Sequence, residues 1–350
     1  MKTFLKKLFK KDIVGLDIGS SSVKVIQLDR KNNKIFLKKV NFSELTFSPW
    51  DNISSLQHLI QNIWYQYKID STRVGISLSG KKAIVRYIEF PYMENKDLKK
   101  ALPFEIQTNI PFSLQDAIIS FQVIDEFEKS GTKMVRIVYA VSRREEIEKI
   151  VNLLEGVGLE VVFIDLDMFS LARAYNFVKN CKGESDILMV NLGASVTNFN
   201  FLHNGVSLFA RDINWGGNLI TSALQNSLKI TFKEAEKIKR ERVLIFQDKE
   251  KKFVPHTYIN GPLVQLVKEI NLIIHHCLFN FHLNSIDCLY ISGGTALLKN
   301  LNCFLEEKIG IPVRIFNPFK NMEDNLYSID KISIPPTLFS TALGIALRFQ

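Results

Sequence analysis

The stretch VGLDIGSSSVKVIQL, residues 14–28, is the most informative part of the sequence, because residues 188–202, LMVNLGASVTNFNFL, repeat its pattern 174 positions later. Each stretch is an apolar run, an Asx-x-Gly turn with small hydroxyl residues, and a second apolar run. This pattern predicts a β-hairpin whose turn needs glycine. A third strand is expected after each hairpin, at residues 35–40 and 206–210. The chain therefore reads as a duplication.

Helix–strand alternations of the α/β kind surround both hairpins. Apolar residues at helical spacing from 56 to 67 lead into a predicted strand at 74–78, and similar units follow at 134–165 and 286–316. We expect two lobes around a shared cleft. The expected parts are a basic tip (1–11), a first core lobe (12–80, 161–186 and 335–350), an inserted subdomain (81–160), a second core lobe (187–226 and 285–334) and a helical subdomain (227–284).

The composition describes a globular chain with more than one core. The chain has 350 residues, of which 46% are hydrophobic and 23% charged, which excludes a disordered protein and favours two domains. Four cysteines without CxxC spacing predict buried thiols in a reducing cytoplasm. No apolar run approaches the roughly 20 residues of a membrane span, so we expect no transmembrane helix.

The net charge of +9 is concentrated at the start of the chain. Five lysines fall within the first eleven residues, around two phenylalanines and two leucines, so a helix there would have an apolar and a cationic face. Such a tip suits an anionic membrane surface or an acidic partner, and a frayed, solvated terminus is the alternative. Asp12 closes the segment too early for a signal peptide. The body of the chain has no basic stripe with interleaved aromatics, so no nucleic-acid partner is expected.

One apparent phosphate-binding motif lacks the right context. Residues 75–82, GISLSGKK, nearly match a P-loop, but Lys82 stands where the magnesium-binding Ser or Thr belongs. The alternating residues predict a strand with a turn at Ser79 and Gly80, which leads through a hairpin into a strand at 83–90. No helix is expected after the turn. We therefore reject the P-loop interpretation.

The first repeated hairpin has the features of a phosphate clamp. Gly19 allows a sharp turn whose N–H groups can converge on phosphate oxygens, Lys24 adds a positive charge, and Asp17 can hold Mg²⁺ through water. A tight structural hairpin is the alternative. Three further features follow in order: the second hairpin at Asn191, a Gly216-Gly217-Asn218 turn before an amphipathic helix, and Gly293-Gly294-Thr295 at a strand-to-helix turn.

This ordered set resembles the actin and sugar-kinase superfamily. The resemblance implies an α/β, actin-like fold, a duplicated ribonuclease-H-like architecture that binds ATP or ADP with Mg²⁺. It implies a first phosphate loop (Asp17, Gly19, Ser20, Ser21, Lys24), a second (Asn191, Gly193, Ala194, Ser195, Thr197), a helix turn (Gly216, Gly217), an adenosine-side wall (Gly293, Gly294, Thr295) and ribose and purine contacts (Glu236, Lys239). Solvated helix charges are the alternative for Glu236 and Lys239.

The segment at residues 90–112 is similar to the type IV pilus assembly protein PilM family. It combines Pro-Tyr-Met with an amphipathic helix and an Ile-Pro-Phe turn. The resemblance implies a cytoplasmic adaptor, peripheral to the inner membrane, that binds the N-terminal peptide of a PilN-like membrane protein and contacts the assembly ATPase. A groove beside the inserted subdomain would take this peptide. Its candidate wall residues, for which core packing is the alternative, are Phe90, Tyr92, Met93, Phe104 and Ile110.

Two departures limit what the resemblance implies. Asn191 stands where the enzymes of the superfamily have aspartate, so hydrolysis is expected to be slow or absent and enzymatic activity stays open. Pro103 would kink the predicted helix at 96 or mark its true start. A sugar-kinase-type phosphotransferase with Asp165 or Asp167 as its base, and an FtsA-like division or filament protein, are the alternative functions.

Overall fold

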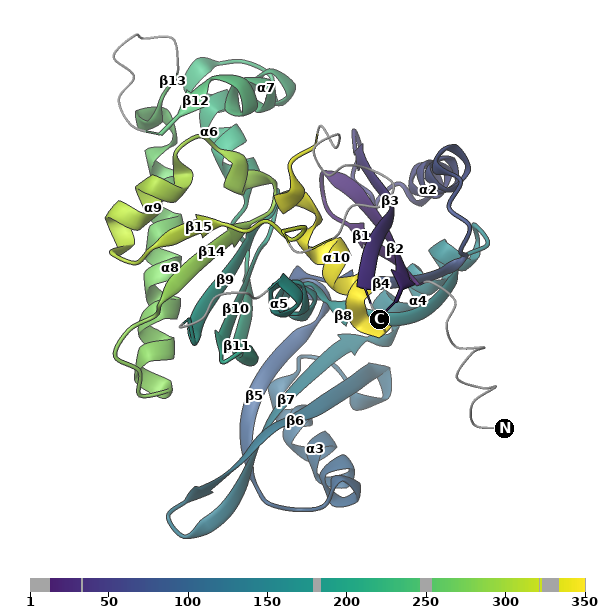
Figure 1. Cartoon of the computed structure of the whole chain (residues 1–350), viewed down its shortest axis with the longest axis vertical. Helices are drawn as coiled ribbons and strands as arrows, with labels where there is room; N and C mark the ends of the chain where they lie inside the picture. The colour runs from purple at the N-terminus through teal and green to yellow at the C-terminus, as the bar shows by residue number, and fades with distance from the viewer. Residues whose placement is uncertain are drawn as a thin grey trace.

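The structure is a computed structural model that describes residues 13–32, 34–178, 184–245, 254–320, 322 and 334–349. The predicted basic tip lies outside the described residues. Two lobes stand side by side, and a smaller sheet with one helix extends from the first (Figure 1). Within the described part of the chain, no helix is both long and apolar enough to cross a membrane.

Each lobe is built on a five-stranded sheet with the same strand order. The first sheet has the order β3-β2-β1-β4-β8 and the second β11-β10-β9-β14-β15. In both, the first three strands are antiparallel and the last two join in parallel. The strands are β1 (Val14–Ile18), β2 (Ser22–Lys31), β3 (Lys34–Glu44), β4 (Arg73–Leu78), β8 (Glu160–Leu166), β9 (Asp186–Leu192), β10 (Thr197–His203), β11 (Val206–Ile213), β14 (Cys288–Ser292) and β15 (Val313–Ile315). The shared topology confirms the predicted duplication.

Helices cover both faces of each sheet. One face of the first sheet packs on α2 (Ile53–Tyr67) and α4 (Arg144–Glu155), and one face of the second on α6 (Gly217–Leu228), α8 (Asn260–Asn280) and α9 (Leu301–Ile309). Between the sheets, α5 (Asp167–Val178) and α10 (Ser340–Ala346) form a shared apolar layer (Figure 1). Gly15 of β1 allows the close approach of α10, because a Cβ there would overlap the carbonyl oxygen of Ala342.

The inserted subdomain has its own small core. Its sheet has the order β5-β7-β6, with β5 (Ile84–Pro91), β6 (Ala117–Lys129) and β7 (Thr132–Arg143), and α3 (Asn95–Asn109) packs on it. The helix begins at Asn95 and continues through Pro103, so Pro103 does not mark its start. The next helix, α4, contributes Ile150 and Leu154 to the core of the first lobe, so the core of the insertion ends earlier than the expected boundary at 160.

The turn after β4 differs from the sequence prediction. The strand, its turn and the absence of a following α-helix are as expected, because β4 leads into a single turn of 3₁₀-helix, η1 (Gly80–Lys82). The predicted hairpin is wrong. Strand β4 pairs with β1 and β8 in the first lobe, whereas β5 pairs with β7 in the inserted subdomain. The turn therefore joins two separate sheets.

The expected helical subdomain starts at the outer end of the second lobe (Figure 1). It begins with α7 (Phe232–Arg242), whose N-terminus is fixed by a capping box between Thr231 and Glu234. Two short strands, β12 (Val243–Leu244) and β13 (Val254–Pro255), precede α8. The remaining short turns of helix are η2 (Leu114–Asp116), η3 (His256–Ile259), η4 (Gly294–Leu297), η6 (Pro336–Phe339) and η7 (Leu347–Phe349).

Candidate nucleotide cleft and partner groove

The first hairpin places one positive charge across its turn. The N–H of Gly19 donates to the carbonyl of Ser22 at 3.0 Å, which closes the turn with Ser20 and Ser21 exposed at its tip. Asp17 and Lys24 are opposite each other in the strand register, and their side chains form an ion pair at 3.2 Å. The pair is mostly buried, so the ammonium is held in place and a phosphate would meet a fixed cation.

The second hairpin has neutral side chains at the equivalent positions. The side-chain amide of Asn191 donates to Oδ1 of Asn198 at 2.9 Å, and the amide of Asn198 donates in turn to Oδ1 of Asp212 at 2.8 Å. These three residues face one another in register on β9, β10 and β11. The result is a row of amides whose donors all point towards one carboxylate.

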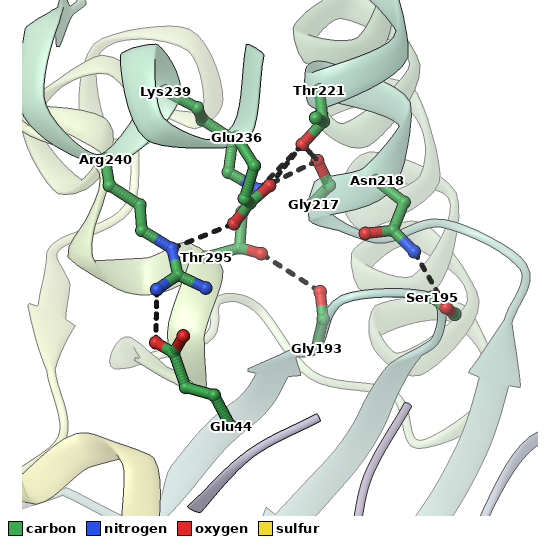
Figure 2. Close-up of polar contacts among 10 residues, drawn as sticks. All are labelled: Glu44, Gly193, Ser195, Gly217, Asn218, Thr221, Glu236, Lys239, Arg240 and Thr295. Atoms are coloured by element: carbon green, nitrogen blue, oxygen red, sulfur yellow. Dashed lines mark hydrogen bonds and ion pairs between the residues drawn. The ribbon is translucent and has the colours of Figure 1, made fainter. Parts of the chain in front are cut away.

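The carbonyl of Gly193 is the point where three elements of the second lobe meet. It accepts the N–H of Gly217 at 2.9 Å and the hydroxyl of Thr295 at 3.0 Å (Figure 2). A Cβ on Gly217 would lie 2.5 Å from the Thr295 hydroxyl, and one on Gly293 would lie 2.6 Å from Oδ1 of Asn191. Only glycine fits such approaches, so the three predicted glycine turns form one surface. Gly294 is exposed beside it.

The start of α6 packs directly on the second hairpin. A Cβ on Gly216 would lie 2.5 Å from the carbonyl oxygen of Ala194, and the side-chain amide of Asn218 donates to the hydroxyl of Ser195 at 3.1 Å (Figure 2). Thr197 is different from its neighbours. It is buried and its hydroxyl donates to the carbonyl of Trp215 at 2.9 Å, so this side chain faces the interior of the lobe.

The predicted ribose and purine contacts, Glu236 and Lys239, lie together on α7 but differ in how far their side chains are free to contact a ligand. The Lys239 ammonium is buried and donates to the carbonyl of Gly217, the hydroxyl of Thr221 and Oε2 of Glu236 at 3.2, 2.9 and 2.7 Å (Figure 2). All three of its donors are used, so it joins α7 to α6. Although burial acts to raise the pKa of Glu236, Lys239 holds it below its ordinary value, and this carboxylate stays charged and partly exposed.

An ion pair spans the mouth of the cleft. Arg240 of α7 contacts Glu236 through Nε at 2.9 Å and Glu44, at the end of β3, through Nη1 (Figure 2). Glu44 belongs to the first lobe and Arg240 to the second. Both side chains of this inter-lobe pair are about half exposed, so its contribution to stability is small.

Two partly buried carboxylates lie on the floor of the cleft. Asp167, the first residue of α5, accepts a hydrogen bond from the hydroxyl of Ser77, and burial together with the Asp17 carboxylate raises the pKa of Asp167 to about 7. Burial also raises the pKa of Asp212 to about 6. Asp165, the other candidate base, is instead bound by Arg173 and Arg348 at 2.9 and 3.0 Å. Of the two candidates, Asp167 has the position and pKa of a proton acceptor.

Among the described residues, no three metal-ligating side chains converge on one point. Magnesium typically binds proteins through one or two carboxylates and completes its shell with water and substrate phosphates. Asp17 at the first hairpin fits that limited role, with its side chain already beside the cation of Lys24. A metal there would therefore depend on bound phosphates for most of its ligands.

Sequence reasoning missed four contributors to the cleft: Asn198, Asp212, Thr221 and Gly80, whose N–H donates to Oδ2 of Asp212 at 2.5 Å. Asn198 follows Lys24 by the same 174 positions that separate Asn191 from Asp17, so the repeat itself could have identified it. The near P-loop contained Gly80, but its local pattern describes a turn and nothing more. Asp212 and Thr221 lie on a strand and a helix whose patterns carry no sign of the cleft.

A cavity lies on the first lobe between α2 and α4, next to the turn η1 from which the chain enters the inserted subdomain. Its volume is about 540 Å³, and its lining residues come from the loop before α2, α2 itself, η1 and α4: Trp50, Asp51, Ile53, Gln57, Lys82, Glu146, Lys149, Ile150, Asn152 and Leu153. The ammonium of Lys82 lies 3.0 Å from the centre of the Trp50 ring. The cavity combines apolar walls with a charged rim, which suits a peptide segment more than a small polar ligand.

The predicted groove residues do not line this cavity. Phe90, Met93 and Ile110 are partly buried and pack on the core of the inserted subdomain, as the alternative of core packing expects. Tyr92 and Phe104 are exposed, and Lys133 lies over the ring of Tyr92 at 3.7 Å. These five side chains therefore form no single surface with the cavity.

Comparison with known proteins agrees with the fold. A family model described as type IV pilus assembly protein PilM matches residues 15–350. A solved structure described as the PilM–PilN type IV pilus biogenesis complex is similar with a TM-score of 0.84 and 22% identity, covering 97% of this chain and 98% of that one.

More distant structures share the architecture. The ethanolamine utilization protein EutJ from Carboxydothermus hydrogenoformans has a TM-score of 0.54 and 17% identity, covering 96% of this chain and 89% of the other. MreB5 of Spiroplasma citri bound to ADP has a TM-score of 0.54 and 13% identity, covering 96% and 95%. These matches show an actin-like fold.

Proposed function

The chain belongs to the type IV pilus assembly protein PilM family, and we propose from that membership that it is an actin-like, nucleotide-binding adaptor of the pilus assembly machinery. Its partner would be the N-terminal cytoplasmic segment of a PilN-like inner-membrane protein. The observation that carries the proposal is the family match over residues 15–350, and the likeness to a PilM–PilN complex supports it. We propose that the protein is cytoplasmic and reaches the inner membrane through this partner.

We propose that the cleft binds ATP or ADP with Mg²⁺. Lys24 would contact the phosphates, and the N–H groups of the two hairpin turns would surround them. The Gly293 turn would lie against the adenosine, with the Glu236 carboxylate near the ribose. Nucleotide is recorded in a structural relative, MreB5 bound to ADP, which supports a nucleotide in this cleft.

We expect any hydrolysis to be slow. The neutral amide of Asn191 attracts a metal less than a carboxylate would. Its NH₂ group already donates a hydrogen bond to Oδ1 of Asn198. Asp167, with a pKa of about 7, favours one other activity, phosphate transfer to a hydroxyl acceptor. ADP formation that depends on an added sugar would establish that alternative, whereas the family match favours the adaptor.

We propose that the partner segment binds in the 540 Å³ cavity beside the inserted subdomain. Ile53 and Trp50 are apolar lining residues that reach the surface and can contact the segment, and Lys82 and Glu146 can bond to its main-chain and polar groups. The exposed aromatics Tyr92 and Phe104 are further away on the insertion and remain candidates for a different contact, such as the assembly ATPase. The basic tip remains a candidate contact with the membrane surface.

The test is calorimetric titration of the full chain with a synthetic peptide covering the cytoplasmic N-terminus of a PilN protein. Ile53→Asp places a charge on the cavity wall at a partly exposed position, so we expect at least tenfold weaker binding with the fold intact. Tyr65→Asp, on the exposed face of the same helix, is the matched control and should bind like the wild type. Equal binding by all three proteins would refute this location of the site.

A further inference from the structure

Lys82 is held in place at the wall of the cavity on the first lobe. It is the last residue of the single turn η1, and its carbonyl accepts a hydrogen bond from the hydroxyl of Ser142 at 2.6 Å. Its half-buried side chain lines the 540 Å³ cavity, and its ammonium lies 3.0 Å from the centre of the Trp50 ring. The amine therefore faces a space that a small molecule can enter.

The ammonium of Lys82 contacts an aromatic ring where two other buried ammonium groups of this protein contact a carboxylate. Lys24 pairs with Asp17, and Lys239 pairs with Glu236. Within the described ranges, no carboxylate forms an ion pair with Lys82. A ring face attracts an ammonium electrostatically, but it offers neither a negative charge nor a lone pair. Burial of Lys82 is therefore not compensated by a counter-ion, and this favours loss of its proton.

The charges around the cavity do not offset the burial of Lys82. Glu146 of α4 and Asp167 of α5 favour its charged form, and Lys149 of α4 opposes it. Asp51 also lines the cavity, without an ion pair to Lys82. Burial is the largest cause and lowers the pKa of Lys82 to about 8. About half of the Lys82 side chains are neutral at that pH, whereas an ordinary lysine is almost fully charged, and the neutral amine is the nucleophilic form.

We propose that Lys82 is a site of covalent acylation, at which a small activated acyl donor, either an acyl phosphate or an acyl thioester, modifies the amine on the cavity wall. The amine nitrogen attacks the acyl carbon, and an N–C bond forms. The bond from the acyl carbon to the phosphate oxygen or to the thioester sulfur breaks. The leaving group takes the electron pair and the amine proton, so the products are a neutral amide and free phosphate or free thiol.

The consequence for the partner segment rests on the proposed function. An acylated Lys82 has lost its positive charge and its attraction to the Trp50 ring, and its acyl group occupies part of the cavity. Acylation is therefore expected to weaken binding of the partner segment in this cavity. A bound segment is in turn expected to shield the amine from the acyl donor.

The experiment compares Lys82 with Lys149 in the full chain. Lys149 lines the same cavity and its side chain is 55% exposed, but Glu145 pairs with it at 2.7 Å and raises its pKa. Accessibility alone predicts faster reaction of Lys149, whereas the missing counter-ion predicts faster reaction of Lys82. With limiting acetyl phosphate or acetyl-CoA at about pH 8, peptide mass spectrometry should find Lys82 acetylated at least about tenfold faster than Lys149. The donor that gives this preference identifies the class of acyl donor. A rate at Lys82 no higher than at Lys149 with both donors would overturn the proposal.

The pH dependence of the two rates is a second measurement on the wild-type chain. Lys82 loses its proton near pH 8, whereas Lys149 keeps its proton beyond the ordinary pKa of lysine. Above about pH 8 the rate at Lys82 should level off while the rate at Lys149 still rises, so the ratio of the rates should fall several-fold by about pH 10. A ratio that stays constant over this range would overturn the proposal.

A variant separates this inference from the proposed function. Lys82→Arg keeps a cation that can stack on Trp50, but a guanidinium stays protonated and is not acylated under these conditions. Calorimetry should show the PilN peptide bound at least about fivefold more weakly by the acetylated wild type than by the untreated protein. Lys82→Arg should bind the peptide equally before and after treatment. If Lys82 is acetylated as expected and the peptide binds as before, the partner groove is refuted and the acylation site stands. Equal rates at Lys82 and Lys149 would refute the acylation site and leave the groove standing.

Discussion

The two repeated hairpins share strand order, register and turn, yet they differ in charge. The first carries an ion pair between Asp17 and Lys24, and opposite Lys24 on the next strand is an apolar residue, Phe42. The second carries Asn191 and Asn198 at the equivalent positions, and its row continues to Asp212. The difference teaches that one backbone motif can present a fixed charge in one lobe and N–H groups and amide dipoles in the other, and we propose that both arrangements serve to hold phosphate.

The largest expected effect is on the charged hairpin. Lys24→Ala should weaken nucleotide binding by about 2 kcal/mol, roughly 30-fold, because the fixed cation is lost and Asp17 then repels the phosphates. Calorimetric titration with ATP and with ADP measures the change. Lys308→Ala removes the same charge from an exposed pair with Glu307 and should bind nucleotide like the wild type. Unchanged binding by Lys24→Ala would show that the first hairpin does not act through charge.

The next prediction concerns a substitution that makes the second hairpin resemble the first. Asn191→Asp places a carboxylate against Oδ1 of Asn198, whose amide is already given to Asp212, so we expect a loss of about 1.5 kcal/mol in unfolding free energy. Mg²⁺ with ATP should restore much of this loss and raise any hydrolysis. Thermal unfolding with and without MgATP measures the restoration.

The control for this substitution is Asn176→Asp, which also loses an amide bond, the one to the carbonyl of Gly205 at 2.7 Å. It should destabilise the protein without any restoration by Mg²⁺. If MgATP stabilises the wild type, Asn191→Asp and the control by equal amounts, the side chain at position 191 has no specific effect on metal binding.

The two hairpins also meet electrostatically at Asp167. Its pKa is raised by burial, by the Asp17 carboxylate of the first lobe and by the Asp212 carboxylate of the second. Its pKa is raised to about 7, so the folded protein keeps the proton while the unfolded chain releases it near pH 4. Stability contributed by the proton is therefore lost as the pH rises from about 4 to 7. Asp167→Asn should be more stable than the wild type by about 1 kcal/mol at pH 8, and by less at pH 5.

Urea denaturation at the two pH values measures this difference. Asp165→Asn, two residues earlier, is the contrast, because it deprives Arg173 and Arg348 of their common partner and should destabilise at both pH values. An Asp167→Asn variant that is less stable than the wild type at pH 8 would mean that the carboxylate is better compensated than its burial indicates.

The smallest effect concerns the link between the lobes at the mouth of the cleft. Glu44→Gln removes the charge of the exposed contact with Arg240 and should change the unfolding free energy by less than about 0.5 kcal/mol. Its dissociation rate for nucleotide should rise no more than a few-fold, and the difference from the wild type should vanish at high salt. Stopped-flow release of a fluorescent ADP analogue measures it. A large change at high salt would give this pair a role beyond charge.

Sequence alone predicted the parts of the cleft that are local in the chain. An Asx-x-Gly turn between apolar runs specifies a hairpin, and the repeat specifies which residues of the two hairpins correspond. The contacts of Gly80 and Asp212 could not be predicted, since they join segments 132 residues apart and depend on how the lobes pack. Three of the five predicted groove residues, Phe90, Met93 and Ile110, pack on the core of the inserted subdomain for a related reason. An amphipathic pattern at 98–106 turns its apolar face inward, and neighbours such as Phe90 pack with it.

The contact between β1 and α10 has a consequence for the order of synthesis. β1 begins at Val14 and α10 ends at Ala346, so a ribosome makes the second partner more than 300 residues after the first. Each sheet is made of one contiguous stretch of chain, β1 to β8 and β9 to β15, and both can form while translation continues. The apolar faces that the two sheets present to α10 are therefore expected to be open to chaperones until that helix emerges.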